Sequence, residues 1–325
     1  PTNKIMIYDE AQRAWDSDQV SSRPHSLGDE FKNLSEPEIL IKLAEKVADW
    51  CVVVCLIGNG QEIHTGEEGG LVLWKEAIEK SESKSNWDIY VPNTDTIFQD
   101  FHDLGNLNKK ECLYLKETIR FHASKFLIEF VKRLLSLDSQ GAYEMSVKLE
   151  KSGYHLRMTH EFEKARRYVS DRYEGNREAR YGILCSAKDK DLNKHLGGIE
   201  KGYGKAGEIR KGKYGQWFSN GKGQDISCCN LDKVTTEFGV QGLELDFSLL
   251  AWGTDLIIDD NKWSNKYAAG YADSSKIKDP LNLRINAYRV LLTRGREGMV
   301  VFVPPISDKA RPLYAHLKRS GFKEL

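Results

Sequence analysis

The sequence contains no long hydrophobic run and no excess of charge of either sign. Its longest apolar stretch covers residues 51–57, well short of the ~18 consecutive apolar residues that a membrane-spanning helix needs. Lysine plus arginine and aspartate plus glutamate number 48 each, so the formal net charge is zero. We therefore expect no signal peptide and no membrane association. Bulk charge alone does not indicate a nucleic-acid-binding protein.

Cysteine is present, but never as a Cys-x-x-Cys pair. The six cysteines are Cys51, Cys55, Cys112, Cys185, Cys228 and Cys229. Their spacing offers neither the usual zinc motif nor a redox motif. Cys51 and Cys55 are conceivable metal ligands, but buried reduced thiols are the favoured interpretation because both lie in one apolar run. Reduced cysteines are typical of the cytoplasm, which is the expected location.

The length of the chain predicts more than one domain. At ~150 residues per domain, 325 residues suggest two lobes. The seam is expected between Phe101 and Lys116, where polar residues surround Gly105. This gives a first domain over 1–110 and a second over 111–325, the latter with a C-terminal helical tail. Because the chain opens without methionine and directly on a strand, we expect a fragment of a longer protein.

Apolar, β-branched runs alternate with segments of helical period, which predicts an α/β fold with a mostly parallel sheet. The predicted strands cover residues 4–8, 51–57, 87–91, 154–158, 181–186, 247–252 and 299–303. The predicted helices cover residues 36–50, 124–137 and 280–293. Each helix has apolar residues at helical spacing, and Pro280 suits the first helical position of the third.

Charges are segregated along the chain even though they balance overall. Residues 164–180 and 201–213 lean basic, and each stretch fits a solvated face about as well as a phosphate-binding groove. The Gly- and Lys-rich stretch 197–223 is interpreted as a mobile loop inserted in the second lobe. Trp217 within it could stack on nucleic-acid bases, although such residues more often pin a loop to its domain.

The first candidate site is an apolar strand that ends at Asp9 and Glu10. In an α/β protein this places two carboxylates at the carboxyl edge of a sheet, where ligands bind. In a nucleotide hydrolase the first would hold Mg²⁺, a hard cation that prefers oxygen ligands. The second would deprotonate the attacking water. Two acids that cap a strand end are the alternative interpretation.

Two further candidates lie at a turn and ahead of a helix. The run 51–57 leads into Gly58-Asn59-Gly60-Gln61, a tight turn whose Gln61 could sense a γ-phosphate. Arg120 stands just before the predicted helix 124–137. In isolation, an ordinary Gly-Asn turn and a surface arginine explain these residues equally well.

The last two candidates flank predicted strands. Residues 235–246 lead into the strand 247–252, and residues 286–296 precede the strand 299–303. Arg294, in the second block, is a fixed cationic fork of the kind that stabilises charge on a transferring phosphoryl group.

Together and in this order, the five blocks resemble motifs II, III, IV, V and VI of superfamily 1 helicases. More specifically, they resemble the Schlafen group 3-type DNA/RNA helicase domain. The matching runs are Asp-Glu-Ala-Gln-Arg-Ala-Trp at 9–15, Gly-Gln-Glu-Ile at 60–63, Gln-Gly-Leu-Glu at 241–244 and Leu-Thr-Arg-Gly at 292–295. The resemblance covers nearly the whole chain. It implies a P-loop NTPase fold of two RecA-like lobes with mostly parallel sheets, the first lobe incomplete.

The resemblance assigns nucleotide chemistry to residues near the start of the chain. ATP and Mg²⁺ are the implied cofactors. Asp9 would be the Mg²⁺ ligand and Glu10 the catalytic base, while Gln12 and Gln61 would face the γ-phosphate.

The second lobe would complete the site. Arg120 and Arg294 would act as arginine fingers. Gln241, Gly242 and Glu244 would contact the nucleotide and couple it to nucleic acid, with Glu244 accepting a hydrogen bond from the ribose hydroxyl. Thr236 would lie near the nucleic-acid backbone.

The sequence departs from the superfamily pattern at several points. Asn59 stands where motif III commonly has Asp, and Phe238 stands where motif V often has His. The Gly-x-x-x-x-Gly-Lys-Ser/Thr loop is absent. The Gly-x-Gly-x-x-Gly run at 202–207 lacks the flanking strand and helix that a dinucleotide fingerprint requires. Without a phosphate cradle, the chain alone is expected to bind ATP poorly and to be inactive.

The implied protein is a motor that couples ATP hydrolysis to movement on single-stranded DNA or RNA. The alternative is a catalytically silent RecA-like scaffold that binds nucleic acid or protein. A nuclease or defence module would lie outside this chain, because no suitable cluster of carboxylates with lysine is evident within it.

Overall fold

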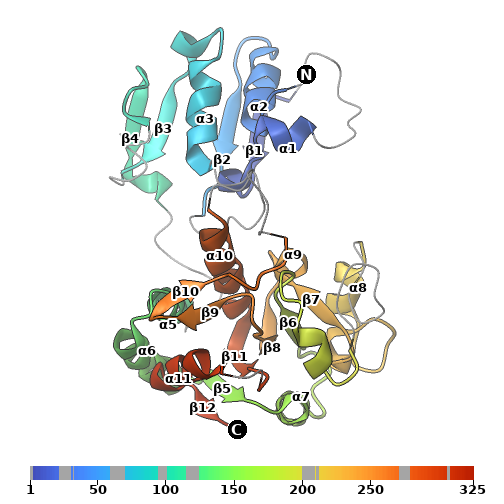
Figure 1. Ribbon diagram of the computed structural model, residues 1–325. Coiled ribbons are helices and arrows are strands. Elements are labelled where there is room, and N and C mark those ends of the chain that lie inside the picture. The colour runs from blue at the N-terminus through green and yellow to red at the C-terminus, as the bar shows by residue number, and fades with distance from the viewer. Residues whose placement is uncertain are drawn as a thin grey trace. The chain divides into compact units, whose positions relative to one another are not determined.

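The computed structural model describes residues 3–21, 31, 33–58, 70–93, 101–114, 124–199, 209, 212–270, 279–305 and 308–325. They form two compact units, one from the described residues up to 114 and the other from residue 124 onward (Figure 1). Residues 111–114, which we predicted in the second domain, lie in the first unit.

The first unit is built on two short parallel sheets, each of two strands. Strand β1 (Ile5–Tyr8) pairs with β2 (Val52–Cys55), and β3 (Ile89–Pro92) pairs with β4 (Leu107–Lys110). The helices of this unit are α1 (Ser17–Ser21), α2 (Glu36–Glu45), α3 (Gly70–Glu79) and the short 3-10 helices η1 (Ala11–Arg13), η3 (Lys84–Asn86) and η4 (Glu111–Leu113).

Strands β1 and β2 bury one face only. Tyr8, Val53 and Cys55 pack against the core, which gathers Ala11, Ala14, Ile41, Trp74, Ala77, Ile78 and Phe101. The opposite face is apolar but exposed, with Ile5, Ile7, Val52 and Val54. The strands of a parallel sheet are usually covered on both faces and are therefore apolar on both. Strands β1 and β2 have this composition, although only one of their faces is covered.

Local sequence signals fix where α2 begins. Ser35 caps the helix in a capping box, because its Oγ accepts from the Glu38 amide (3.4 Å) while the Glu38 carboxylate accepts from the Ser35 amide (2.7 Å). Pro37 lies in the first turn, where its missing N–H costs nothing. The helix thereby begins at a defined point and covers the inner face of β1 and β2.

The second unit contains a six-stranded sheet in which every described pairing is parallel, in the order β12-β5-β11-β8-β6-β7. The strands are β5 (His155–Thr159), β6 (Tyr181–Cys185), β7 (Val234–Thr236), β8 (Leu245–Ala251), β11 (Gly295–Phe302) and β12 (Lys323–Glu324). A separate antiparallel hairpin is formed by β9 (Ile257–Asp259) and β10 (Lys262–Ser264).

The helices of the second unit connect and cover these strands. They are α5 (Ser124–Leu135), α6 (Ser139–Lys151), α7 (Phe162–Arg172), α8 (Tyr214–Ser219), α9 (Glu237–Val240), α10 (Pro280–Leu292), α11 (Arg311–Arg319) and the 3-10 helices η5 (Leu192–His195) and η6 (Cys228–Asn230). Helices α5, α6, α10 and α11 pack against one another in a chain of contacts.

Strands β6 and β8 are neighbours in the interior of the sheet. Every residue of these strands is buried, which matches their continuous apolar sequence and the covered faces of a parallel sheet. Next to β8, β11 shifts register between Gly295 and Gly298. At Gly298 a β-carbon would come within 2.5 Å of the His155 carbonyl oxygen, so only glycine permits this close approach.

The α/β class and the parallel sheet predicted from the sequence are confirmed. All seven predicted strands and all three predicted helices are present, with ends that differ by a few residues. The interpretation of 197–223 as a mobile loop is wrong for its last part. Residues 214–219 form α8, and Trp217 of this helix is completely buried. Residues 200–208, 210 and 211 lie outside the described residues.

The first part of the basic stretch 164–180, up to Arg172, lies in α7 and has an outward-facing charged side. Within α7 the buried residues are Phe162, Ala165 and Val169. Arg166 pairs with Glu163 across one turn at 3.0 Å, partly exposed to solvent. A solvated helix face therefore accounts for this part of the sequence.

Candidate functional site

The carboxyl end of β1 presents the acidic pair. The strand ends at Tyr8, and Asp9 is exposed while Glu10 is half-buried. Glu10 adopts a left-handed backbone (φ 54°, ψ 44°), an uncommon conformation for a residue with a β-carbon. The Asp9 carboxylate accepts a hydrogen bond from the Glu10 amide at 3.0 Å. The tight turn places both carboxylates at the edge of the sheet where α/β proteins bind ligands.

Gln12 connects this acidic pair to the second predicted block. Its side chain is 1% exposed. The Nε2 group donates to Glu10 Oε2 at 2.5 Å, and Oε1 accepts from the Gly58 amide at 2.8 Å. Gly58 immediately follows the run that contains β2, so one buried amide bridges the ends of neighbouring parallel strands. Both of its polar ends are satisfied, which fixes the position of the Glu10 carboxylate.

A second set of contacts holds the segment after Glu10 in place. The Trp74 indole donates to the Ala11 carbonyl at 2.6 Å. Glu36 accepts from the Tyr8 hydroxyl (2.6 Å) and from the Trp15 amide (2.9 Å). Burial, followed by the hydrogen bond to Glu36, raises the pKa of Tyr8 well above its usual range, so the hydroxyl stays a donor. The acidic pair therefore sits on a rigid support.

Two predicted catalytic residues cannot be placed. Gln61 and Arg120 both lie outside the described residues. Their roles stay predictions from the sequence.

In the second unit, the predicted nucleotide and nucleic-acid residues lie on one segment. This segment, residues 236–244, runs from the end of β7 through α9 to the start of β8. Thr236 is buried and stands at the N-terminal cap of α9. Gln241 and Glu244 are partly exposed, while Gly242 is exposed and has φ +83°. The positive φ explains the glycine, because other residues rarely adopt it.

Arg294 is held against this segment. It follows α10 and is 3% exposed. Its Nε donates to the Val290 carbonyl at 2.9 Å, and its Nη1 donates to the carbonyls of Val240 (3.3 Å) and Leu243 (3.1 Å). Its Nη2 donates to the Thr293 hydroxyl at 3.1 Å. The structure thus brings Arg294 and the segment 236–244 together through hydrogen bonds to the backbone.

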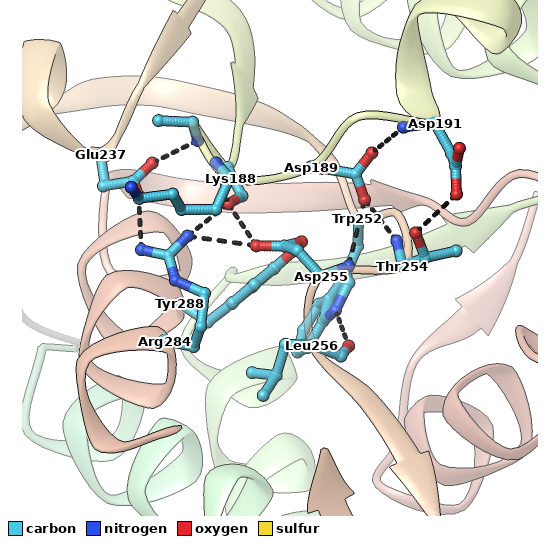
Figure 2. A network of polar contacts seen from close by, with 12 residues as sticks. Lys188, Asp189, Asp191, Glu237, Trp252, Thr254, Asp255, Leu256, Arg284 and Tyr288 are labelled. Carbon is cyan, nitrogen blue, oxygen red and sulfur yellow. Dashed lines mark hydrogen bonds and ion pairs between the residues drawn. The ribbon is translucent and has the colours of Figure 1, made fainter. Parts of the chain in front are cut away.

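A buried ionic network lies beside this segment, at the carboxyl ends of β6, β7 and β8 (Figure 2). Arg284, on α10, donates to Glu237 at 2.7 Å and to Asp255 at 3.1 Å, and all three side chains are 0% exposed. Ser186 accepts from Arg284 at 2.5 Å and contacts Asp255. The Tyr288 hydroxyl, one turn along α10, donates to Asp255 at 2.6 Å.

The network continues into the loops after β6 and β8. Asp189 accepts from the amides of Asp191 and Leu192, both at 2.8 Å, and from those of Thr254 and Asp255. The loops are thereby tied together by one carboxylate.

Burial, and then the nearby Arg284 charge, lowers the pKa of Lys188 in the first of these loops. The loops that Asp189 ties together therefore also carry a lysine, Lys188, that loses its proton more readily than an exposed lysine does.

These network residues were not predicted from the sequence as a site. Glu237 lies within the predicted motif 235–246, but the motif assigns it no function. Arg284 lies in the predicted helix 280–293, whose sequence is mainly apolar. A usable signal existed, since Ser186 and Glu237 each directly follow a buried strand and Asp255 follows another by a few residues. Polar groups at adjacent carboxyl ends of a parallel sheet converge in space.

The expectation that Trp217 stacks on nucleic-acid bases does not fit its position. The side chain is 0% exposed and packs against Gly182, where a β-carbon would lie 2.7 Å from its ring. Stacking needs an accessible ring face. The alternative interpretation, that Trp217 pins this part of the chain to its domain, agrees with the burial.

The described part of the chain offers neither a membrane-spanning helix nor a metal-binding cluster. No helix there is long and apolar enough to cross a membrane. No group of three or more His, Cys, Asp or Glu side chains able to hold a metal ion was found among the same residues.

The fold and the placement of these residues define a RecA-like α/β protein, with polar side chains at the carboxyl edges of parallel strands. Residues 1–305 match the family model described as Schlafen group 3, DNA/RNA helicase domain, and the chain belongs to this family. No curated protein matches the chain. The family membership confirms the resemblance inferred from the motifs.

Proposed function

We propose that this chain is part of a nucleic-acid-dependent ATPase that couples ATP hydrolysis to movement along single-stranded DNA or RNA. The membership in a helicase-domain family supports a nucleic-acid-related function. The observation that carries the finer proposal is the arrangement of Glu10, Gln12 and Gly58, in which a buried amide fixes a carboxylate at the carboxyl edge of a parallel sheet.

The first unit supplies the hydrolytic groups in this proposal. Asp9 is exposed at the strand end and offers the oxygen ligand that Mg²⁺ prefers. When bound with ATP, Mg²⁺ would neutralise charge on the phosphates. Glu10 is half-buried, with one carboxylate oxygen bonded to Gln12. The other oxygen can accept a proton from an attacking water, which is the role of a general base.

The second unit supplies cationic and coupling groups. Arg294 would stabilise charge on the transferring phosphoryl group, and Gln241 and Glu244 would respond to the nucleotide. Gln241 and Glu244 lie on the segment 236–244, and Arg294 donates hydrogen bonds to its backbone. This proximity supports a joint role for the three residues. Thr236, buried at the start of this segment, would lie near the nucleic-acid backbone.

The phosphate cradle is the part of the site that this sequence does not provide. It contains no Gly-x-x-x-x-Gly-Lys-Ser/Thr motif, so β- and γ-phosphates would lack the backbone N–H donors and the lysine that usually bind them. We propose that turnover belongs to the full-length protein, whereas the isolated chain binds ATP weakly.

The alternative proposal is a silent scaffold that binds nucleic acid or protein without turnover. The carboxylate pair and the buried Gln12 support the ATPase instead, because a scaffold has no need to hold Glu10 in a left-handed conformation beside an amide.

An assay of inorganic phosphate released from ATP distinguishes the ATPase from the scaffold. The full-length protein is assayed with MgATP, with and without single-stranded DNA and RNA oligonucleotides whose binding is followed in parallel by fluorescence anisotropy. An ATPase shows turnover that rises when the oligonucleotide is bound. Oligonucleotide binding with no turnover above background would instead support the scaffold.

A further inference from the structure

The side chain of Arg294 holds the turn at residues 240–243, although the proposed function needs the same side chain to contact a phosphate group. Arg294 Nη1 donates to the carbonyls of Val240 (3.3 Å) and Leu243 (3.1 Å), which flank Gln241 and Gly242. With its bonds to Val290 and Thr293, these contacts occupy four of the five N–H groups of the guanidinium. Arg294 cannot donate the same N–H groups to these carbonyls and to an anionic ligand.

We propose that Arg294 acts as a latch, by which we mean that its hydrogen bonds to Val240 and Leu243 hold residues 240–243 in place. When a phosphate group accepts hydrogen bonds from Arg294 instead, residues 240–243 are released. The inference rests on the proposed function, in which the anion belongs to a nucleoside triphosphate. A phosphate oxygen carries negative charge and attracts the guanidinium more strongly than a neutral carbonyl oxygen does, so phosphate oxygens compete effectively with the two carbonyls.

The beginning of the segment is anchored independently of the latch. Glu237 accepts from Arg284 at 2.7 Å and from the Ala187 amide at 2.8 Å, with both charged side chains fully buried. Arg284 also contacts Asp255, which fixes it from the other side. Loss of the Arg294 contacts therefore leaves the start of α9 in place.

Free space beside Gly242 leaves the turn room to change its conformation. Gly242 is exposed, with φ +83°, and a β-carbon there would have nothing within 4 Å. The amide of Leu243 donates to the Val240 carbonyl at 3.0 Å, so this carbonyl is shared between the turn and Arg294. When Arg294 breaks its hydrogen bonds to the turn, residues 240–243 become looser and Gln241 shifts. We expect Gln241 to couple the nucleotide to nucleic acid.

Hydrogen exchange of the full chain, read by mass spectrometry, tests the latch without any ligand. In Arg294→Lys the charge remains, but a single ammonium cannot reproduce the fork on both carbonyls. We expect exchange of residues 241–243 to be roughly 10- to 30-fold faster, as for the loss of two hydrogen bonds to neutral acceptors. Exchange in β8 should stay unchanged, which shows that the variant is folded. Equal exchange in variant and wild type would overturn the latch.

Arg296→Lys is the matched control. Arg296 lies two residues away and contacts Asp246 at the start of β8, but it is partly exposed and does not contact the turn in any described interaction. We expect wild-type exchange at 241–243 in this variant. A speed-up equal to that of Arg294→Lys would overturn the specific role of Arg294.

A second arm adds MgATP to the full-length protein and to its Arg294→Lys variant, with binding confirmed by a fluorescent nucleotide. Bound MgATP should accelerate exchange at 241–243 in the wild type and add nothing in the variant. Bound nucleotide with an unchanged turn would overturn release by the ligand. Failure of MgATP to bind would count against the proposed function, while the comparison of the variants still decides whether Arg294 holds the turn.

Discussion

The buried arginine of the second unit can be compared with an arginine at the surface that has the same number of acidic partners. Arg284 contacts Glu237 at 2.7 Å and Asp255 at 3.1 Å, with side chains that are 0% exposed. Arg133 contacts Glu129 and Asp138, both at 2.8 Å, but its side chain is 39% exposed. The two arginines differ mainly in burial, so substitution by leucine isolates that factor.

The expected costs differ by several kcal/mol. Arg284→Leu leaves two carboxylates buried without their cation, and breaking such a pair from one side costs about 3–5 kcal/mol. Arg133→Leu removes a solvent-screened pair worth about 0–1 kcal/mol. Since a whole domain is stable by only ~5–15 kcal/mol, Arg284→Leu should remove a large part of the stability of the second unit.

Urea unfolding followed by tryptophan fluorescence measures both costs. Trp252 stacks on Tyr288 with ring centroids 4.2 Å apart, and Tyr288 shares Asp255 with Arg284, so the part of the signal that comes from Trp252 reports on the network. The unfolding midpoint should fall strongly for Arg284→Leu and little for Arg133→Leu. A cost of 1 kcal/mol or less for Arg284→Leu would refute the view that its charge holds the network together.

Three further substitutions test other parts of the structure. Burial lowers the pKa of His316 below its usual 6.5, so the unfolded state binds the proton more readily and stability falls as pH drops below 6.5; urea midpoints at pH 7 and pH 5 should differ less in His316→Gln, which cannot titrate. Gln12→Ala removes the hydrogen bonds that its buried side chain makes to the half-buried Glu10 carboxylate and to the Gly58 amide, and should lower the unfolding free energy of the first unit by ~1–3 kcal/mol in urea; no change would contradict its bridging role. Gly239→Ala would place a β-carbon 2.3 Å from neighbouring side-chain atoms and should cost ~1–3 kcal/mol by thermal unfolding, whereas Gly215→Ala, with nothing within 4 Å, should not; equal effects would refute the steric argument.

The sequence predicted the layered α/β fold because its strongest signals are periodic. The short apolar runs at 181–186 and 247–252 favoured covered strands, and they form most of β6 and β8, two neighbouring buried strands in the interior of the sheet. Helix α7 was missed as an element because its charged face dominates the sequence and only Phe162, Ala165 and Val169 are buried. Composition outweighed periodicity in that stretch.

The contacts within the candidate site could be predicted only in part. The sequence showed that Asp9 and Glu10 follow a predicted strand, but the hydrogen bond that Gln12 accepts from the Gly58 amide joins residues 46 positions apart. The Arg284 network joins four separate segments. The packing of Trp217 against Gly182 could not be predicted either, because its polar neighbours in sequence are not its neighbours in space. Pairings of this kind depend on the tertiary fold, which local sequence does not encode.

The most direct test of the central claim is the turnover of ATP by the full-length protein and its Glu10→Gln variant at saturating single-stranded DNA or RNA. The substitution keeps the size of the side chain beside Gln12 and removes only the base. A general base contributes about 10²–10⁴-fold to rate, so the proposal predicts turnover that depends on nucleic acid and falls by at least about 100-fold in the variant, with oligonucleotide binding retained. Equal turnover in the two proteins, or none in either, would contradict it.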